Sequence, residues 1–405
     1  MIGEAMPRWL RQSRPLGLLA GIAVALCLLG TSLAQTERGR PQSIATQNQA
    51  ESDPQETTPN PDQQAEAELR AGTTLTRQGK FADAIPHLLA ARGHVSSNYA
   101  ASFNLALCYV GTEQYEQAIA ILSSIRQGRE QNADVENLFA QAYIGAGQSQ
   151  LGWEAFQRAA ALTPTNEKLY IFIADACMGS QDYSLGLKVA EQGLAKLPHS
   201  AALHYEHGFF LTQLDEFDRA KKDFDLATQL APSSQISYLA SANEELYAGN
   251  PQAAARDARE GIGKGYEHPV LLAILGESLI RSGARPGDAD FSEAQAVLEK
   301  SVAMNSRNPS AQVSLGNLYL MADRPADAIA HLERARQLEP GNPAIYAGLA
   351  RAYQRRGDAE QAQQALATLA KLNQAQADKI ASAPGDRKAS YAGLGSEPSK
   401  PPDHP

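Results

Sequence analysis

Apolar, small and proline residues recur along the chain with a period of 34 residues. Pro164, Pro198 and Pro232 are spaced by this distance, and so are Pro309 and Pro343. Self-similarity at a fixed spacing of this length is the sequence signature of a stacked array, in which each repeat is one small supersecondary unit. Ala, Leu, Gln, Glu and Arg are abundant, so helix propensity dominates, and each unit is predicted to be a helical hairpin.

Counting from Ala65 divides residues 65–376 into nine units. All units have 34 residues except the seventh, which has 40. The six extra residues fall within segment 284–291, which we place in the turn of the seventh hairpin. The units start near residues 65, 99, 133, 167, 201, 235, 269, 309 and 343.

The unit at 309–342 shows why particular positions carry particular residues. Gly316 at position 8 and Ala328 at position 20 are small, which lets the two helices of the hairpin approach closely. Pro340 at position 32 stops the second helix, so the next unit starts on schedule. Large residues at positions 7, 11 and 24 fill the space around the close contact, and these are Leu315, Tyr319 and Leu332.

This pattern resembles the tetratricopeptide repeat family, whose units read W-x2-L-G-x2-Y and then carry Ala, Phe, Ala and Pro. The chain departs from it at position 4, which is Tyr170, Tyr238 or Tyr346 in three units and never Trp. Gly152 and Gly186 also replace Ala at position 20. The resemblance implies an all-α fold, a right-handed α-solenoid (superhelix) of about nine helix-turn-helix hairpins with disordered N- and C-terminal segments.

The N-terminus has the pattern of a secretory signal. Residues 1–14 form a short, positively charged segment, and residues 16–30 form an unbroken run of apolar residues and glycine. Ser32-Leu33-Ala34 then supplies the small residues that a signal peptidase recognises. We expect residues 1–34 to be a signal peptide that is cleaved after Ala34, which would make the protein periplasmic or secreted. The alternative is an uncleaved N-terminal helix that anchors the chain in the inner membrane.

Two segments outside the array are expected to be disordered. Residues 35–64 are rich in Gln, Thr, Pro, Asn and Glu and have almost nothing apolar, so they cannot bury enough surface to offset chain entropy. We interpret them as a linker. The tail at 377–405 contains five prolines and is assigned to disorder beyond the last helix.

Charge and cysteine content narrow the choice of partners. The formal net charge is −9, and without residues 1–34 the chain has 33 basic and 44 acidic residues. An acidic body argues against nucleic-acid binding, and the membrane would be contacted only through an uncleaved N-terminal segment. Beyond the leader, Cys108 and Cys177 lie on predicted helices, and we expect two small buried residues, although a disulfide is possible in an oxidising compartment.

The resemblance also implies where a partner would bind. In this family the first helix of each hairpin lines a concave groove, mainly through positions 2, 5, 9 and 12. Amides there can hydrogen-bond an extended peptide, and aromatic rings can hold its side chains, although part of the row could instead pack between units. The predicted groove residues are Phe103, Leu107, Asn137, Gln141, Ile171, Asp175, Tyr205, Phe209, Leu239 and Asn243, followed by Glu277, Asn317 and Arg351.

A dicarboxylate clamp is not expected. That branch of the family uses Lys and Asn, then Asn, then Lys and Arg on three successive first helices. The row in this chain lacks that set, and only Lys168 stands at a groove-facing position 2. The chain is therefore not predicted to bind acidic C-terminal peptides of chaperones.

Candidate chemistry is sparse. His204 and His207 lie three residues apart on one helix face, as a metal pair would, but no third ligand is apparent, and we expect His207 to be a partly buried packing residue. The glycine-rich segment 261–265 is placed at the end of a second helix, so it reads as a helix stop rather than a phosphate loop. No metal or other cofactor is predicted.

These observations favour binding over catalysis. Once leader, linker, repeats and tail are assigned, no stretch is long enough for a catalytic domain, so we do not expect an enzyme. The leading hypothesis is an exported scaffold that binds a protein or peptide partner in its groove. The alternative is a structural subunit of an envelope assembly, such as a secretion, pilus or polysaccharide-export machine.

Overall fold

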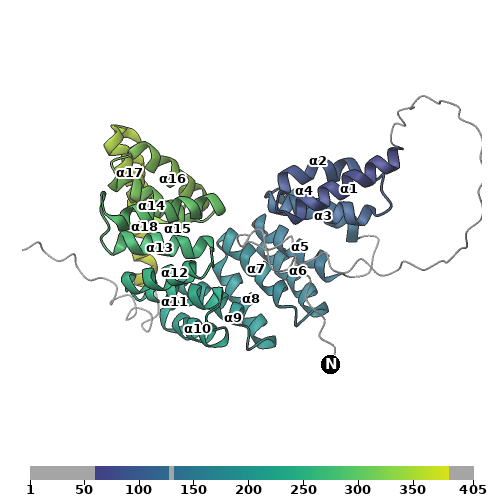
Figure 1. Cartoon of the computed structure of the whole chain (residues 1–405), viewed down its shortest axis with the longest axis horizontal. Helices are drawn as coiled ribbons and strands as arrows, with labels where there is room; N and C mark the ends of the chain where they lie inside the picture. Colours follow the sequence, from purple (N-terminus) through teal and green to yellow (C-terminus); the bar gives the residue numbers. More distant parts are fainter. Residues whose placement is uncertain (1–59, 127–131, 383–405) are drawn as a thin grey trace, which may run out of the picture. The chain divides into compact units, whose positions relative to one another are not determined.

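The chain folds into helical hairpins (Figure 1). The computed structural model describes residues 60–126 and 132–382, and within them it has eighteen α-helices and no strand. The predicted all-α fold of repeated hairpins is therefore confirmed. The helices are α1 (Pro61–Arg77), α2 (Phe81–Ala91), α3 (Asn98–Gly111), α4 (Tyr115–Arg126), α5 (Ala133–Gly145), α6 (Ser149–Leu162), α7 (Glu167–Ser180), α8 (Tyr183–Lys196), α9 (Ala201–Gln213), α10 (Phe217–Leu230), α11 (Gln235–Tyr247), α12 (Pro251–Gly263), α13 (Pro269–Arg281), α14 (Ala289–Met304), α15 (Pro309–Met321), α16 (Pro325–Leu338), α17 (Pro343–Arg356) and α18 (Ala359–Ser382).

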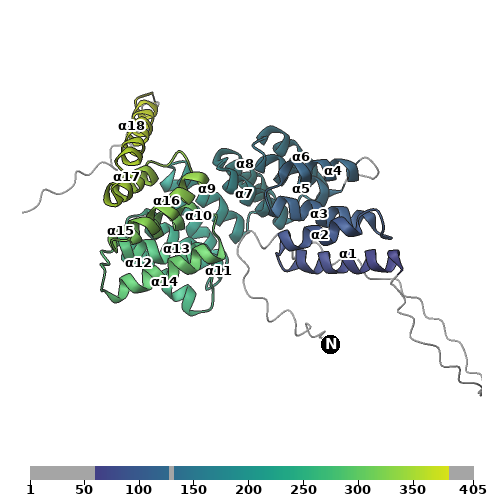
Figure 2. The same ribbon diagram turned by 90° about the horizontal axis from the view of Figure 1, so that it is seen from above.

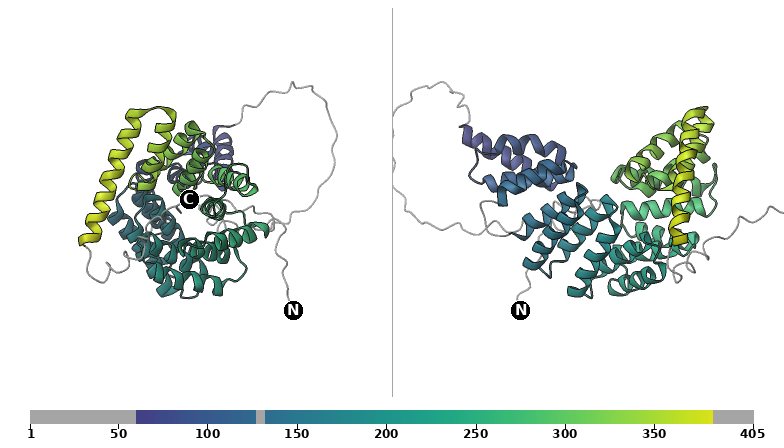
Figure 3. Two further views of the ribbon diagram at one scale, coloured as in Figure 1. Left: turned by 90° about the vertical axis from the view of Figure 1, so that its left-hand side faces the viewer. Right: turned by 180° about the vertical axis from the view of Figure 1, so that it is seen from behind.

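The helices belong to two compact units, and the division passes through α11. The N-terminal unit comprises the described residues up to Ala240, and the C-terminal unit those from Ser241. In the N-terminal unit the first helices α1, α3, α5 and α7 each pack on their own second helix and on the next first helix, as α5 does on α6 and α7 (Figure 2). The C-terminal unit repeats this arrangement with α13, α15 and α17. Figure 3 shows the green to yellow helices of this unit from two further sides. Successive first helices therefore form one continuous layer within each unit.

Helix starts follow the repeat. In seven hairpins the first helix begins at the residue where the sequence period places a unit start, from 133 to 343. Asn308 caps α15 because its side chain accepts a hydrogen bond from the Ala311 backbone N–H at 3.1 Å. Pro309 then occupies the first turn, where its missing N–H costs nothing. Asn342 and Pro343 repeat this pair at α17.

Tyrosine at position 4 has a specific hydrogen-bond partner in two of the hairpins. The Tyr170 hydroxyl donates to the Pro164 carbonyl at 2.8 Å, and the Tyr346 hydroxyl donates to the Pro340 carbonyl at the same distance. In both cases the acceptor is the proline that follows the preceding second helix. The hydrogen bond therefore ties the junction between two consecutive hairpins.

Small residues allow the close approach inside each hairpin. A Cβ placed on Gly316 would lie 2.6 Å from Leu332 Cγ, and one on Gly72 would lie 2.6 Å from Leu88 Cγ. Both glycines hold position 8 and both leucines hold position 24. The second helix contributes Ala328, which has no exposed surface. The predicted roles of positions 8, 20 and 24 are thus seen directly in the packing.

We expect Gly316→Ala to lower the free energy of unfolding of the C-terminal unit by about 1–2 kcal/mol. The new methyl group overpacks the Leu332 contact, and this cost outweighs the roughly 1 kcal/mol that alanine gains over glycine in a helix. Urea unfolding followed by circular dichroism measures the difference. Gly263→Ala is the matched control, because nothing lies within 4 Å of its Cβ, and it should not destabilise. Equal destabilisation by both variants would contradict the close-contact explanation.

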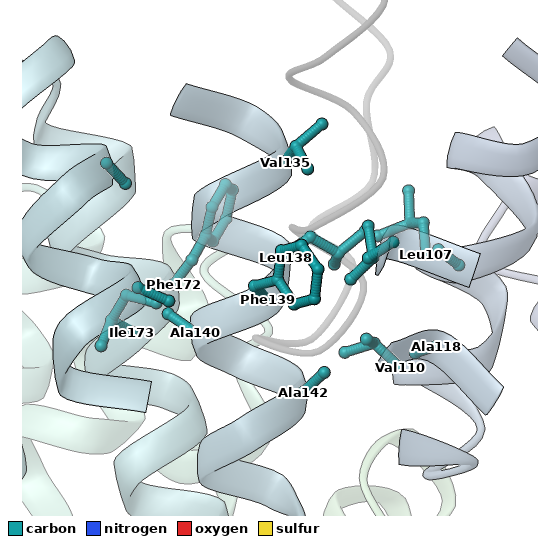
Figure 4. Packing of buried hydrophobic residues seen from close by; sticks show 14 of the residues in the cluster. Leu107, Val110, Ala118, Val135, Leu138, Phe139, Ala140, Ala142, Phe172 and Ile173 are labelled. Carbon is teal, nitrogen blue, oxygen red and sulfur yellow. The ribbon is translucent and has the colours of Figure 1, made fainter. Parts of the chain in front are cut away.

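The core of the N-terminal unit runs through successive hairpins. Figure 4 shows α5 between its neighbours, with Leu138 near Leu107 of α3 on one side and Ala140 near Phe172 and Ile173 of α7 on the other. These residues belong to one continuous buried cluster. A single hairpin could not bury both sides of α5, so the apolar surface of each unit is stabilised by its neighbours.

The ends of the array differ from the sequence assignment. Helix α1 already begins at Pro61, so residues 61–64 are helical although we assigned them to the linker. Asn60 caps this start, which lets a polar first turn form with its side chains exposed. Helix α18 runs on to Ser382, so residues 377–382 extend the last helix instead of starting the tail. Their Ala and Lys content supports helix without requiring burial.

The predicted signal peptide at 1–34, most of the linker and the tail beyond 382 lie outside the described residues. Across 60–126 and 132–382, no helix is long and apolar enough to span a bilayer. The segment 284–291, which we placed in the turn of the seventh hairpin, begins between α13 and α14, where Gly287 has a positive φ of 101°. Its last three residues already belong to α14, which begins at Ala289.

Candidate functional site

Position 9 of successive first helices brings side chains together. In the C-terminal unit, Arg351 Nη2 donates to Asn317 Oδ1 at 3.2 Å, although the two residues are 34 apart in sequence. In the N-terminal unit the same position holds Gln141 on α5 and Asp175 on α7, and these helices pack against each other. We call positions 5 and 9 of the first helices the first-helix row.

Most apolar residues of the first-helix row are buried. Phe103 is 8% exposed and Leu107 3%, and both belong to the core cluster. Tyr205 and Leu239 expose 3% and 1%. Side chains with so little free surface offer a partner almost no contact area, so these four act in packing between hairpins. The packing alternative raised from the sequence therefore accounts for them.

Two apolar residues of the row keep free surface. Ile171 on α7 and Phe209 on α9 are half-buried and rest on the edge of the core cluster. The Phe209 ring meets Phe210 edge-on, with centroids 6.0 Å apart. Both side chains therefore pack against the core cluster and keep part of their surface exposed. This arrangement suits an apolar anchor for a partner.

The amides of the row form a partly satisfied pair. Gln141 Nε2 donates to Asn137 Oδ1 at 3.3 Å, one turn earlier on α5. The other polar atom of the side chain, Gln141 Oε1, is buried and has no hydrogen-bond partner. Gln141 is only 4% exposed, so this oxygen is an acceptor held in place without a donor. Asn243, at the corresponding place on α11, is also 4% exposed.

Asp175 faces a second acid. Burial, followed by the charge of the Glu206 carboxyl, raises the pKa of Asp175 well above its ordinary value. Burial likewise raises the pKa of Glu206 to about 8. Glu206 is 4% exposed, and its Oε2 atom is buried without a hydrogen-bond partner, whereas Asp175 keeps part of its surface open.

Glu206 is a residue that the sequence interpretation missed as a member of the site. It occupies position 6 of its unit, which is not one of the predicted groove positions. From the sequence, its neighbours His204 and His207 are the candidate ligands instead. Position 6 carries the apolar residues Leu138 and Phe172 in the two preceding units. An acid at a position that is apolar and buried in the two preceding units is the signal that could have identified it.

The two histidines are held by a carboxylate and not arranged around a metal. His204 Nδ1 lies 2.7 Å from Asp223 Oδ1, and His207 Nδ1 lies 2.7 Å from Asp223 Oδ2. These hydrogen bonds hold the pKa of Asp223 below its ordinary value against the opposing effect of burial. His207 is 8% exposed, which agrees with its predicted packing role. Throughout the described ranges, no group of three His, Cys, Asp or Glu side chains could hold a metal ion.

The glycine-rich segment ends a helix, as predicted. Helix α12 stops at Gly263, Lys264 is its C-cap, and Gly265 follows with a φ of 93°. Lys168 is exposed at the start of α7.

Cys108 and Cys177 are both free and fully buried. Burial raises the pKa of the Cys108 thiol to about 11, and it raises the pKa of Cys177 further. We therefore expect neither thiol to be alkylated by iodoacetamide in the folded protein at pH 8, and both to be alkylated after denaturation. Peptide mapping by mass spectrometry gives the result. Modification of either residue in the folded state would show that its helix pair opens.

Comparisons with known proteins agree with this architecture. A tetratricopeptide repeat profile matches residues 75–142 and 319–383, and a second tetratricopeptide repeat profile matches residues 287–343. No curated protein matches the sequence.

Several solved structures are similar to the chain. The Cut9–Hcn1 hetero-tetramer of APC/C is 15% identical with a TM-score of 0.46, and the match covers 77% of this chain and 64% of that one. The C-terminal part of a TPR repeat-containing protein from Cytophaga hutchinsonii is 18% identical, with coverage of 69% and 99% and a TM-score of 0.37. Yeast Tom70 is 15% identical, with coverage of 83% and 97% and a TM-score of 0.36. The chain thus spans less than two thirds of the Cut9–Hcn1 chain that it matches.

The repeat period, the hairpin packing and the two profile matches lead to one assignment. The chain belongs to the tetratricopeptide repeat family.

Proposed function

We propose that this protein is a non-catalytic scaffold that binds a polypeptide partner along the first-helix row of its N-terminal unit. The observation that supports this most directly is the pair Ile171 and Phe209, which stay half-buried on two successive first helices while most other apolar residues of the row lie in the core. Such partly exposed side chains can serve as apolar anchors for a partner. Gln141, on the preceding first helix, has a buried Oε1 that lacks a hydrogen-bond donor.

Crosslinking in intact cells, followed by affinity purification and mass spectrometry, tests the proposal. The wild-type protein should recover a defined partner, and Ile171→Glu should lose it because a charge replaces an apolar anchor. Leu162→Glu is the matched control, since Leu162 is 41% exposed on the second helix α6. If all three proteins recover the same partner equally, binding does not use this face.

Export is the second part of the proposal, and it rests on residues 1–34. The order of positive, apolar and small residues there is typical of a cleaved secretory signal. N-terminal sequencing of the protein from its native cells should begin at Gln35. A sequence that begins at Met1 would instead favour an anchor. A partner present in fixed stoichiometry under every growth condition would favour a structural subunit of an envelope assembly over a scaffold with exchanging partners.

A further inference from the structure

Two other buried carboxyl groups in the described part of the chain, Glu136 and Asp223, have basic partners. Glu136 is 2% exposed, and its Oε2 accepts a hydrogen bond from Arg158 Nε at 2.8 Å. The partly exposed Glu277, at position 9 of α13, also lies 3.5 Å from Arg281 Nη1. Asp223 lies between two imidazoles. This is the general rule for buried charges, which cost several kcal/mol when they are left unpaired.

The pair of Asp175 and Glu206 departs from this rule. The charged group that acts on Asp175 is a second carboxyl, and Glu206 has one oxygen that is buried without any hydrogen-bond partner. Gln141, on the preceding first helix, adds another buried oxygen without a donor. Gln141 on α5 and Glu206 on α9 therefore each contribute one buried oxygen without a donor, and Asp175 on the first helix between them, α7, contributes a second carboxyl group.

The missing group has a definable chemistry. It must carry several N–H donors, because at least two oxygen atoms lack partners. It should be cationic, because a positive charge stabilises both carboxylates while a neutral donor leaves their repulsion in place. It must also approach from solvent, and Asp175 is the member of the acid pair that is partly exposed. An ammonium or guanidinium group at the end of a flexible side chain meets all three conditions.

We propose that Gln141, Asp175 and Glu206 form a receptor for the charged end of a lysine or arginine side chain on a polypeptide partner. This inference rests on the proposed function and specifies its chemistry. Ile171 lies one turn before Asp175 on α7, so the same partner segment can place an apolar residue beside the basic one. The acidic character of the chain as a whole would favour the approach of a basic segment.

A random 12-residue peptide library supplies the probe, because no natural partner has to be known. We expect peptides selected by the purified protein to share one aligned position that is enriched in Lys or Arg. The double variant Asp175→Asn/Glu206→Gln should still bind peptides but lose this enrichment. Both substitutions keep the side-chain shape and remove a buried ionisable group, so folding should be retained, and circular dichroism verifies this. Glu154→Gln, an exposed acid on α6, is the control and should keep the enrichment.

The best peptide then allows a quantitative test. Replacing its aligned Lys with norleucine should weaken binding to the wild-type protein about tenfold or more, as expected for a desolvated charge pair. The same replacement should have little effect on binding to the double variant, because the two changes remove one shared interaction.

Each other outcome has a distinct meaning. Peptides that bind without a shared basic position overturn this receptor but leave the proposed function standing. If no peptide binds at all, both fall. If spermidine binds to the wild-type protein and not to the double variant while peptides show no basic preference, the receptor takes a free amine and the polypeptide assignment is wrong.

Discussion

Replacing Phe156 with alanine is expected to lower the free energy of unfolding of the N-terminal unit by about 3–5 kcal/mol. Phe156 on α6 has no exposed surface. Its ring centroid lies 5.7 Å from that of Tyr170 on α7 in an edge-on arrangement, and 5.3 Å from that of Trp153. The ring therefore joins two consecutive hairpins, and its loss leaves a cavity at their junction.

Urea unfolding monitored by circular dichroism measures this loss. Leu162→Ala on the same helix is the control, because that side chain is 41% exposed and should change the stability by less than about 0.5 kcal/mol. Because each hairpin is stabilised by its neighbours, the variant should also unfold less cooperatively than the wild type. A loss below about 1 kcal/mol would mean that the junction is not packed as described.

The second large effect concerns Glu206→Gln, whose stability difference from the wild type should depend on pH. Burial raises the pKa of Glu206 to about 8, above its value in the unfolded chain, so the folded state holds a proton that the unfolded state releases. Wild-type stability should therefore fall as pH rises from about 4.5 to about 8 and then level off. Glutamine cannot ionise, so the variant avoids this loss.

Thermal unfolding at pH 5 and pH 9 checks the prediction. The two proteins should be nearly equal at pH 5, and the variant should unfold roughly 5 °C higher at pH 9. Burial, followed by the charge of Glu206, raises the pKa of the facing acid Asp175, so Asp175→Asn should shift the curve in the same direction. A difference between wild type and variant that is the same at every pH would contradict a protonated Glu206.

The hairpins can be predicted from the sequence because their determinants are local. Gly316 and Ala328 are small for a contact within one hairpin, and Pro309 and Pro343 begin helices in their own units. A fixed period then carries these rules along the chain. The start of α1 and the end of α18 are harder to predict from the sequence, because these helices are the first and the last of the described array. Helix propensity and capping, and not packing against a further hairpin, decide where they begin and end.

The site is harder to predict because it depends on contacts between units. The sequence row included Asp175 but not Glu206, since a family pattern of groove positions does not say which acid faces another. The same limit applies to Asp223, which comes from the second helix α10 and holds both histidines of α9. Nor could exposure be read from residue type, because Tyr205 is buried and Phe209, four residues later, is half-exposed.

Site-specific photocrosslinking in cells tests the central claim, which is that the first helices of the N-terminal unit bind a polypeptide partner. p-Benzoylphenylalanine replaces Phe209 on α9, where it keeps the phenyl ring and adds a photoreactive benzoyl group at the para position. In a second protein it replaces Leu226, which is 40% exposed on α10 of the same hairpin. The proposal predicts a defined crosslinked partner from position 209 and none from position 226. Crosslinks from position 226 alone, or equally from both positions, would contradict it.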